Sequence, residues 1–243
     1  MKTPQILGII PARGGSKSIP NKNIIDLHGK PLIAHTINVG KNTPSINRLI
    51  VSTDSTEIAD VSSKYGAEIP FIRPSYLAED DTPDLPVFIH CLEWLIENDN
   101  YMPDLIVQLR PTNPFRKSLV IESCIQKMIK NPKADALRVV TPSTVHPYKM
   151  WVVDEDQQYL GPLIKSDISE PYNLPRQSLP ETFQSFGYVD VIRPDTILKK
   201  RSMTGQHILS HILKDVIVMD IDDWQDLEFA RFLADKHLTE DYN

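Results

Sequence analysis

Short runs of consecutive apolar residues recur along the chain and predict the strands of a buried sheet. A strand covered on both faces has a nearly continuous apolar run, whereas a half-exposed strand alternates apolar and polar residues. Apolar runs span residues 6–10, 48–52, 68–72, 104–109, 136–140 and 215–221, and several of them are of the first kind. The chain therefore supplies enough material of this kind for one large sheet.

Between these runs, apolar residues recur at the spacing of a helix, most clearly over 84–97 and 118–130. Asp54, Asp84 and Asp223 stand where helices would begin, and an aspartate there can accept hydrogen bonds from the first turn. The helix after Asp223 would cover the last twenty residues. Strands alternating with helices predict an α/β fold, with a mainly parallel sheet and helices on both faces.

The alternation stops between about 141 and 210, where prolines, aromatic residues and charges are mixed. Alternating apolar positions in this region are typical of hairpins rather than of strand–helix–strand units. We interpret 141–185 as an arm inserted into a single domain of residues 1–243. Such an arm would form a lid, a contact between subunits, or both.

Composition and charge mainly exclude certain classes of partner and of cysteine chemistry. The 243 residues are 41% hydrophobic, enough for one sizeable core, and the net charge of −6 argues against nucleic acid or an anionic membrane as a partner. Cys91 and Cys124 fall within apolar helical patterns, so we expect buried, reduced thiols. The start of the chain lacks a signal-peptide core and no window approaches a membrane span, so we expect a cytoplasmic protein.

The first predicted strand runs into a loop rich in glycine and cations, IIPARGGSKSIPNKN at 9–23. Ligands of a parallel α/β sheet bind beyond the carboxyl ends of its strands, where loops present free N–H groups. Each charge-assisted hydrogen bond to phosphate contributes roughly 1.5–3 kcal/mol, so three or four could hold a triphosphate. The loop has neither the GxxxxGK[ST] nor the GxGxxG pattern. A solvated basic turn is the alternative, which the position directly after a buried strand disfavours.

Two aspartates, Asp220 and Asp222, close the last predicted strand. Residues two apart in an extended chain project to the same side. Two carboxylates there suit Mg²⁺, which commonly takes one or two carboxylates together with phosphate oxygens and water. Alternatively, acidic residues merely end a strand here. A cationic phosphate loop in the same chain favours the metal pair.

Taken in order, the motifs resemble those of the acylneuraminate cytidylyltransferase family, the CMP-sialic acid synthetases and their relatives for other nonulosonic acids. The opening loop is followed by GKPLIAHTI at 29–37. Further matches cover nearly the whole chain in the family's order: VSTDSTEIA, FIRPSYLAED, RPTNPFR, LPRQSLPETF and VMDIDDWQDLEFA. Six matches in register make the resemblance specific.

The resemblance implies a Rossmann-like nucleotidyltransferase that joins a 2-keto-3-deoxy sugar acid to CMP from CTP and releases pyrophosphate. Catalytic positions would be Arg13, Lys22, Asp220 and Asp222, of which the last two would bind Mg²⁺. Nucleotide contacts would come from Ala12, Arg13, Ser16, Lys22, Asn23 and Arg73, the last near the base and ribose. The family is typically homodimeric, and an arm such as 141–185 closes the partner's site.

The chain departs from the family's pattern at the sugar end. Arg110 stands where sialic-acid enzymes usually carry glutamine, and its fork could grip the sugar's carboxylate or pair with an internal acid. Asp190 replaces an aromatic residue and could accept hydrogen bonds from the sugar. Arg176 and Gln177 match the family's RQ pair, either as sugar contacts or as braces of the arm. Sialic, legionaminic and other eight- or nine-carbon keto acids stay open as substrates.

Two other functions share part of this pattern. A glycosyltransferase could bind a sugar nucleotide through a metal on Asp220 and Asp222, and a regulatory module could bind a nucleotide without catalysis. Consuming a free triphosphate requires cations for the departing pyrophosphate, and the opening loop carries them. A non-catalytic module is expected to lose the lysines or the acidic pair, and both are present.

Overall fold

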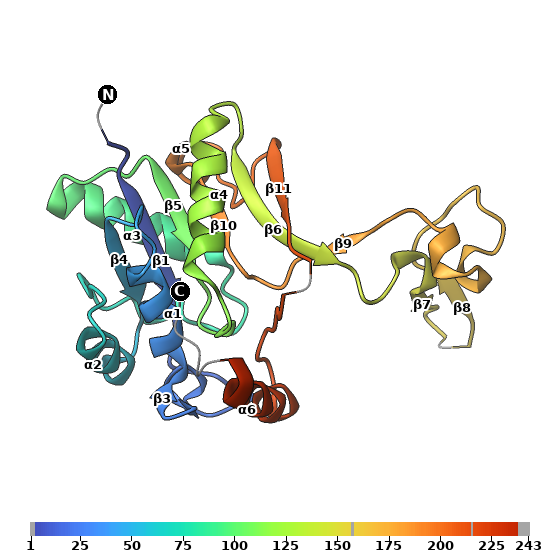
Figure 1. The fold of residues 1–243 in the computed structure, drawn as a ribbon, viewed down its shortest axis with the longest axis horizontal. Coiled ribbons are helices and arrows are strands. Elements are labelled where there is room, and N and C mark those ends of the chain that lie inside the picture. Colours follow the sequence, from blue (N-terminus) through green and yellow to red (C-terminus); the bar gives the residue numbers. More distant parts are fainter. Residues whose placement is uncertain (1–2, 157, 215, 238–243) are drawn as a thin grey trace.

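The computed structural model of the protein describes residues 3–156, 158–214 and 216–237. Its centre is a sheet in the order β11-β6-β10-β5-β1-β4, with β9 also paired to β6 (Figure 1). The strands span Ile6–Pro11 (β1), Arg48–Ser52 (β4), Leu105–Gln108 (β5), Ala136–Pro142 (β6), Phe183–Gln184 (β9), Asp190–Ile192 (β10) and Ile208–Ile212 (β11). β1 is parallel to β4 and β5, and β6 to β11, whereas β10 is antiparallel to both neighbours. The mainly parallel sheet is confirmed.

Helices cover both faces of the sheet, as expected. They span Leu32–Lys41 (α1), Thr56–Lys64 (α2), Asp84–Asp99 (α3), Ser118–Lys130 (α4), Pro194–Leu198 (α5) and Trp224–His237 (α6). Buried side chains of α1, α2 and α4 pack on one face, and those of α3 and α5 on the other. Among the described residues, no helix is long and apolar enough to cross a lipid bilayer.

The two cysteines lie in these two layers. Cys91 of α3 and Cys124 of α4 are free thiols with no exposed surface, and they belong to different core clusters. Burial raises the pKa of each thiol to about 12, so both stay protonated at neutral pH. The expectation of buried, reduced cysteines is confirmed.

The predicted strand at 68–72 is wrong. Glu68 forms a single bridge to Ile50 of β4, and the chain then turns away from the sheet. Pro70 interrupts the run and has no N–H to donate to a neighbouring strand. The segment instead leads to Arg73, whose backbone N–H donates to the carbonyl of Thr53 at 2.7 Å, beyond the end of β4.

The predicted strand at 215–221 is also wrong, for a different reason. Residue 215 lies outside the described residues, and 216–221 form no ladder with the sheet. Met219 and Ile221 are buried in a third apolar cluster with α6 and the small hairpin of β2 (Asp26–Leu27) and β3 (Lys30–Pro31). The apolar run therefore reflects burial under α6 rather than sheet pairing.

The aspartates expected to cap helices differ from one another. Asp223 caps α6, since its carboxylate accepts from two N–H groups of the first turn at 2.8 and 3.0 Å. Ser55, not Asp54, caps α2. Asp84 is the first residue of α3, and its carboxylate accepts a hydrogen bond from Gln108 at 2.8 Å instead of capping. Asp54 and Asp84, which do not cap their helices, instead bind side chains or backbone groups of the cavity described below.

Residues 143–182, called the arm below, leave the sheet between β6 and β9 and stand clear of it in Figure 1. The last two residues of β6 pair with β9 at the neck of the arm. Farther out, β7 (Trp151–Val153) and β8 (Leu160–Pro162) form an antiparallel hairpin. Exposed apolar side chains gather here: Trp151, Val152, Val153, Tyr159, Leu160, Leu163 and Ile164. The arm therefore offers apolar surface that this chain leaves uncovered.

Asp135, which precedes β6, makes fold stability depend on pH. Lys200 at 2.5 Å, then the N–H groups of Gln206 and His207, hold the pKa of this carboxyl well below its ordinary 3.8. A lowered folded-state pKa stabilises the fold above pH 3.8, and this contribution is lost as pH falls through the folded-state value. We expect Asp135→Asn to lower the urea midpoint at pH 7, with a gap to wild type that narrows toward pH 2. A gap independent of pH would contradict this assignment.

Candidate active site

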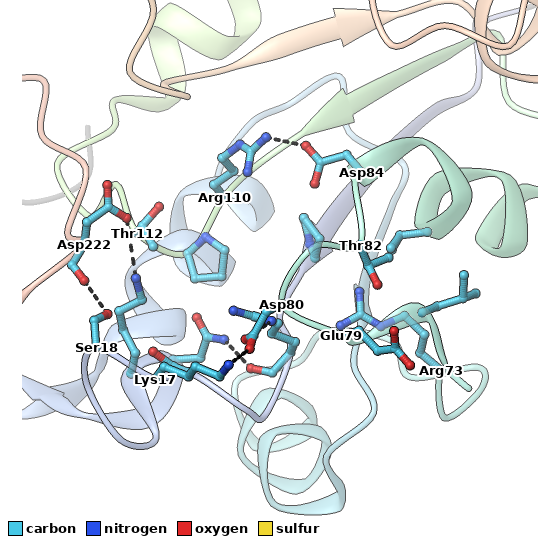
Figure 2. A pocket seen from close by; sticks show the side chains of 18 of the residues that line it. Lys17, Ser18, Arg73, Glu79, Asp80, Thr82, Asp84, Arg110, Thr112 and Asp222 are labelled. Carbon is cyan, nitrogen blue, oxygen red and sulfur yellow. Dashed lines mark hydrogen bonds and ion pairs between the residues drawn. The ribbon is translucent and has the colours of Figure 1, made fainter. Parts of the chain in front are cut away.

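A cavity of about 660 Å³ opens at the edge of the sheet where β1 and β5 end. Four segments that are distant in sequence line it: the loop after β1, the segment that leads into α3, the loop after β5, and the stretch before α6. Figure 2 shows their side chains converging from opposite sides. The two groups selected from the sequence, the cationic loop and the acidic pair, both lie here.

The decisive contact joins the amino-terminal and carboxyl-terminal halves of the site. Lys22 Nζ donates to the carbonyl of Ile221 at 2.9 Å and lies 3.6 Å from Oδ1 of Asp222. Ser18 Oγ donates to the carbonyl of Asp222 at 2.5 Å. Asp222 keeps 77% of its side chain exposed, whereas Lys22 keeps 14%. A cation and a carboxylate separated by most of the chain therefore face one cavity.

The opening loop is held by its own side chains. Asn23 Nδ2 donates to the carbonyl of Arg13 at 2.9 Å, and the N–H of Gly14 donates to Asp54 Oδ1 at 3.0 Å. Gly14 passes so close to α2 that a Cβ on it would lie 3.0 Å from the Cβ of Ser55. Arg13 and Asn23 line the cavity with Ser16, so the loop presents its polar groups inward. Ala12 differs, because it is buried and its N–H is bonded to the carbonyl of Ser52.

Arg73 lines the same cavity but is only 4% exposed. Burial lowers the pKa of its guanidinium, which Asp54 at 3.6 Å partly offsets. Its Nε is buried and has no hydrogen-bond partner among the described residues. A buried donor without a partner costs roughly 1–3 kcal/mol, which a ligand carbonyl or hydroxyl could offset.

The acidic pair fits a hard divalent cation. Burial raises the pKa of Asp220, a hydrogen bond with Thr112 lowers it, and the charge of Asp222 raises it further. The backbone N–H of Ile221 donates to the carbonyl of Thr112 at 2.9 Å, which holds the pair beside the loop after β5. The described residues contain no cluster of three acidic, histidine or cysteine ligands. Two carboxylates beside a cationic loop nevertheless match the usual Mg²⁺ arrangement, in which phosphate oxygens and water complete the shell.

At the far end of the cavity Arg110 is positioned by two neighbours. Its guanidinium pairs with Asp84, whose same oxygen accepts from Gln108. A Cβ on Gly187 would lie only 2.8 Å from Cδ of Arg110, so glycine makes room for this side chain. Arg110 still exposes 44% of its side chain. Of the two roles expected for Arg110, the internal pair is therefore present, with donors left for a ligand.

Comparison with known proteins decides the family. Residues 7–160, more than half of the chain, match the model of the family described as cytidylyltransferase. The chain belongs to this cytidylyltransferase family. Its membership and its class as a nucleotidyltransferase, both expected from the motifs, are confirmed.

Several relatives resemble this cytidylyltransferase over most of their length. A pseudaminic acid cytidylyltransferase of Campylobacter jejuni is 31% identical over 93% of this chain and 95% of its own. A CMP-N,N'-diacetyllegionaminic acid synthase of Legionella pneumophila is 37% identical over 68% of each chain. A solved CMP:2-keto-3-deoxy-manno-octonic acid synthetase in complex with CTP superposes with a TM-score of 0.71 at 17% identity, covering 96% of this chain and 99% of that one. This last likeness confirms the fold.

The remaining sugar-site residues predicted for the cytidylyltransferase lie apart from the cavity. Asp190 of β10 accepts two hydrogen bonds from Arg138, at 2.9 and 2.7 Å, and is 8% exposed. Arg176 lies on the arm and donates to the carbonyl of Ser143. Its neighbour Gln177 is exposed there. None of the three lines the cavity in this single chain, and Arg176 has the bracing contact considered as its alternative role.

Sequence reasoning missed the acidic residues that surround the cations. Asp54 was assigned to a helix cap, yet it holds both the opening loop and Arg73. Asp80 pairs with Arg13 at 2.7 Å and with Lys17, which together lower the pKa of its carboxyl. Asp54 could have been found, because it follows a predicted strand and lies at the same edge of the sheet as the opening loop. Asp80 ends the FIRPSYLAED match, but nothing in the sequence pairs it with the cations of the opening loop.

Proposed function

We propose that this cytidylyltransferase transfers CMP from CTP to the anomeric hydroxyl of a nonulosonic acid and releases pyrophosphate. The observation that carries the proposal is the convergence of Lys22 and Asp222 in one cavity that Arg13 also lines. The printed activities of the relatives, on pseudaminic, legionaminic and N-acylneuraminic acids, support this substrate class. Cations around a triphosphate site also favour this reaction over glycosyl transfer.

The chain's own residues suit an in-line displacement. The sugar hydroxyl oxygen attacks the α-phosphorus, the bond to the β-phosphate oxygen breaks on the opposite side, and pyrophosphate and one proton leave. Lys22 and Arg13 would stabilise the negative charge that grows on the departing pyrophosphate, Ser16 and Asn23 would orient the phosphates, and the orphan donor of Arg73 would contact the base or ribose. Positioning and charge stabilisation of this kind provide most of the acceleration in phosphoryl transfer.

Asp220 and Asp222 would hold Mg²⁺, which supplies charge neutralisation at the α-phosphate when bound. The proposal rests on the partly buried carboxylate of Asp220, whose pKa is raised by burial and by Asp222. A nearby cation would relieve both effects. Thr112 would keep Asp220 oriented toward the cavity.

At the sugar end, Arg110 would receive the carboxylate of the acid. Arg presents several N–H donors in a rigid fork, and Asp84 engages only one edge of it. Because Asp84 is also fixed by Gln108, the fork is held in place before the sugar arrives. Asp190 and Arg176, which lie outside the cavity, would contact sugar only if a second subunit or a movement brought them to it.

Gly187→Ala tests the position of Arg110. The new Cβ would force Arg110 from its place, so we expect kcat/KM for the sugar acid to fall by about tenfold or more, with KM for CTP within twofold of wild type. Gly29→Ala is the matched control, because Gly29 also has a positive φ (+75° against +64°) but no neighbour within 4 Å of a Cβ. Equal losses in both variants would show backbone strain rather than a displaced arginine.

The arm suggests a homodimer. Its exposed apolar side chains, among them Trp151 and Leu160, would be covered by a second copy of the chain, and the same contact could bring the arm to the partner's cavity. We expect light scattering to give twice the mass of one chain for the wild-type protein. Replacing both Trp151 and Leu160 with serine should reduce the measured mass to that of one chain. A cytoplasmic location is part of the same proposal, since CTP is the substrate.

The direct test measures pyrophosphate release with each nucleoside triphosphate against a panel of keto-deoxy sugar acids, in the presence of Mg²⁺. We expect product with CTP and at least one nonulosonic acid. Pseudaminic, legionaminic and sialic acids, together with 2-keto-3-deoxy-octonic acid, form the panel. Absence of pyrophosphate from every pair would remove the proposal.

A further inference from the structure

The phosphate-binding cations of this chain already hold an anion of its own. Asp80 lies in the segment between the turn that ends at Leu77 and the start of α3. Its Oδ1 is 2.7 Å from Nη1 of Arg13, and its Oδ2 pairs with Lys17 Nζ. Figure 2 shows this carboxylate joined to Lys17. All three residues line the cavity.

This arrangement imitates one phosphate group. Two oxygens of one anionic centre contact two cations of the glycine-rich loop, as two oxygens of a phosphate would. A nucleotide phosphate and Asp80 therefore cannot both take the same donors of Arg13 and Lys17. Any phosphate that binds there must exchange with the carboxylate.

Asp80 is also free to leave, in contrast to Asp84, which lines the same cavity. Its side chain is 40% exposed, and among the described residues its ion pairs are with those two cations. Asp84 instead begins a helix and is bonded to both Gln108 and Arg110. The first carboxylate can move with its loop, whereas the second is part of a fixed network.

We propose that Asp80 is an internal competitor that determines which phosphate ligands the opening loop retains. This inference rests on the function proposed above and adds a specificity-determining residue to it. A triphosphate has enough charge and enough oxygens to displace the carboxylate and still contact Lys22. A monophosphate exchanges one anion for another with little gain. After transfer, the returning carboxylate favours the release of pyrophosphate.

The test is calorimetric titration of the intact protein and of Asp80→Asn with pyrophosphate, CTP and CMP. A ligand that displaces Asp80 must break two exposed ion pairs, each of which is individually weak. We therefore expect the Kd for pyrophosphate to fall by about tenfold in Asp80→Asn, and the Kd for CTP to fall as well. A gain in affinity cannot arise from misfolding. The Kd for CMP should fall too, because its phosphate no longer has to displace the carboxylate.

Asp81→Asn is the matched control, since it makes the same change of charge at the next residue, which does not line the cavity. We expect less than a twofold change there. Unchanged or weaker pyrophosphate binding in Asp80→Asn, or an equal gain in Asp81→Asn, would overturn the proposal. Failure of the proposed function is a separate result: the wild-type protein would bind pyrophosphate but form no product from any sugar acid.

Discussion

Lys22→Ala is expected to lower kcat for pyrophosphate release by at least about a hundredfold, in line with the loss of a single preorganised electrostatic group. The side chain of Lys22 is 14% exposed and its ammonium lies 3.6 Å from Asp222 in the cavity, so it is held where charge on the leaving group would grow. Steady-state kinetics with saturating CTP measure the effect. KM for CTP should rise less than kcat falls, because the charge that Lys22 stabilises is largest in the transition state.

Lys22 also bonds the carbonyl of Ile221, so its removal loosens the stretch that carries the acidic pair. Ser18→Ala separates the two effects, because it removes another side-chain tether to this stretch without removing a charge. We expect a loss of tenfold or less from Ser18→Ala. Similar losses in both variants would mean that Lys22 acts as a tether, and wild-type turnover in Lys22→Ala would place the site elsewhere.

Asp222→Ala is the second large effect, again a loss of about a hundredfold or more in turnover. If the acidic pair holds the metal, higher Mg²⁺ should restore part of the rate, and calorimetry should show weaker Mg²⁺ binding to the CTP complex. The carboxylate is 77% exposed, so its removal should change the free energy of unfolding little. Unaltered metal dependence would contradict its assignment.

The neighbouring residue provides a control of the same charge. Asp223 caps α6 and does not line the cavity. Asp223→Ala should cost about 1 kcal/mol of stability, as the loss of a helix cap does, and keep turnover near wild type. Chemical unfolding and turnover should therefore distinguish the two variants. Asp222→Ala should lose turnover and keep its stability, whereas Asp223→Ala should lose stability and keep its turnover. Loss of turnover in both would show that the acidic stretch tolerates no change.

Much of the fold was predictable because it depends on local pattern. Apolar runs located β1, β4, β5 and β6 within a residue or two, and helical spacing located α3 and α4. The same pattern failed at 68–72 and at 215–221. An apolar run indicates that a segment is buried, but it does not indicate what covers the segment. A run buried beneath α6 therefore has the same apolar pattern as a strand buried in a sheet.

The site divides in the same way. The sequence by itself determined the family, the cationic loop and the acidic pair, because each is a short motif whose chemistry is carried by adjacent residues. Only the tertiary structure decided that Lys22 meets Asp222, that Arg110 pairs with Asp84 and Asp190 with Arg138, and that Asp80 pairs with the cations of the opening loop. These partners lie from 26 to 200 residues apart, and a charged side chain pairs with whichever opposite charge the loops and the strand register bring within reach.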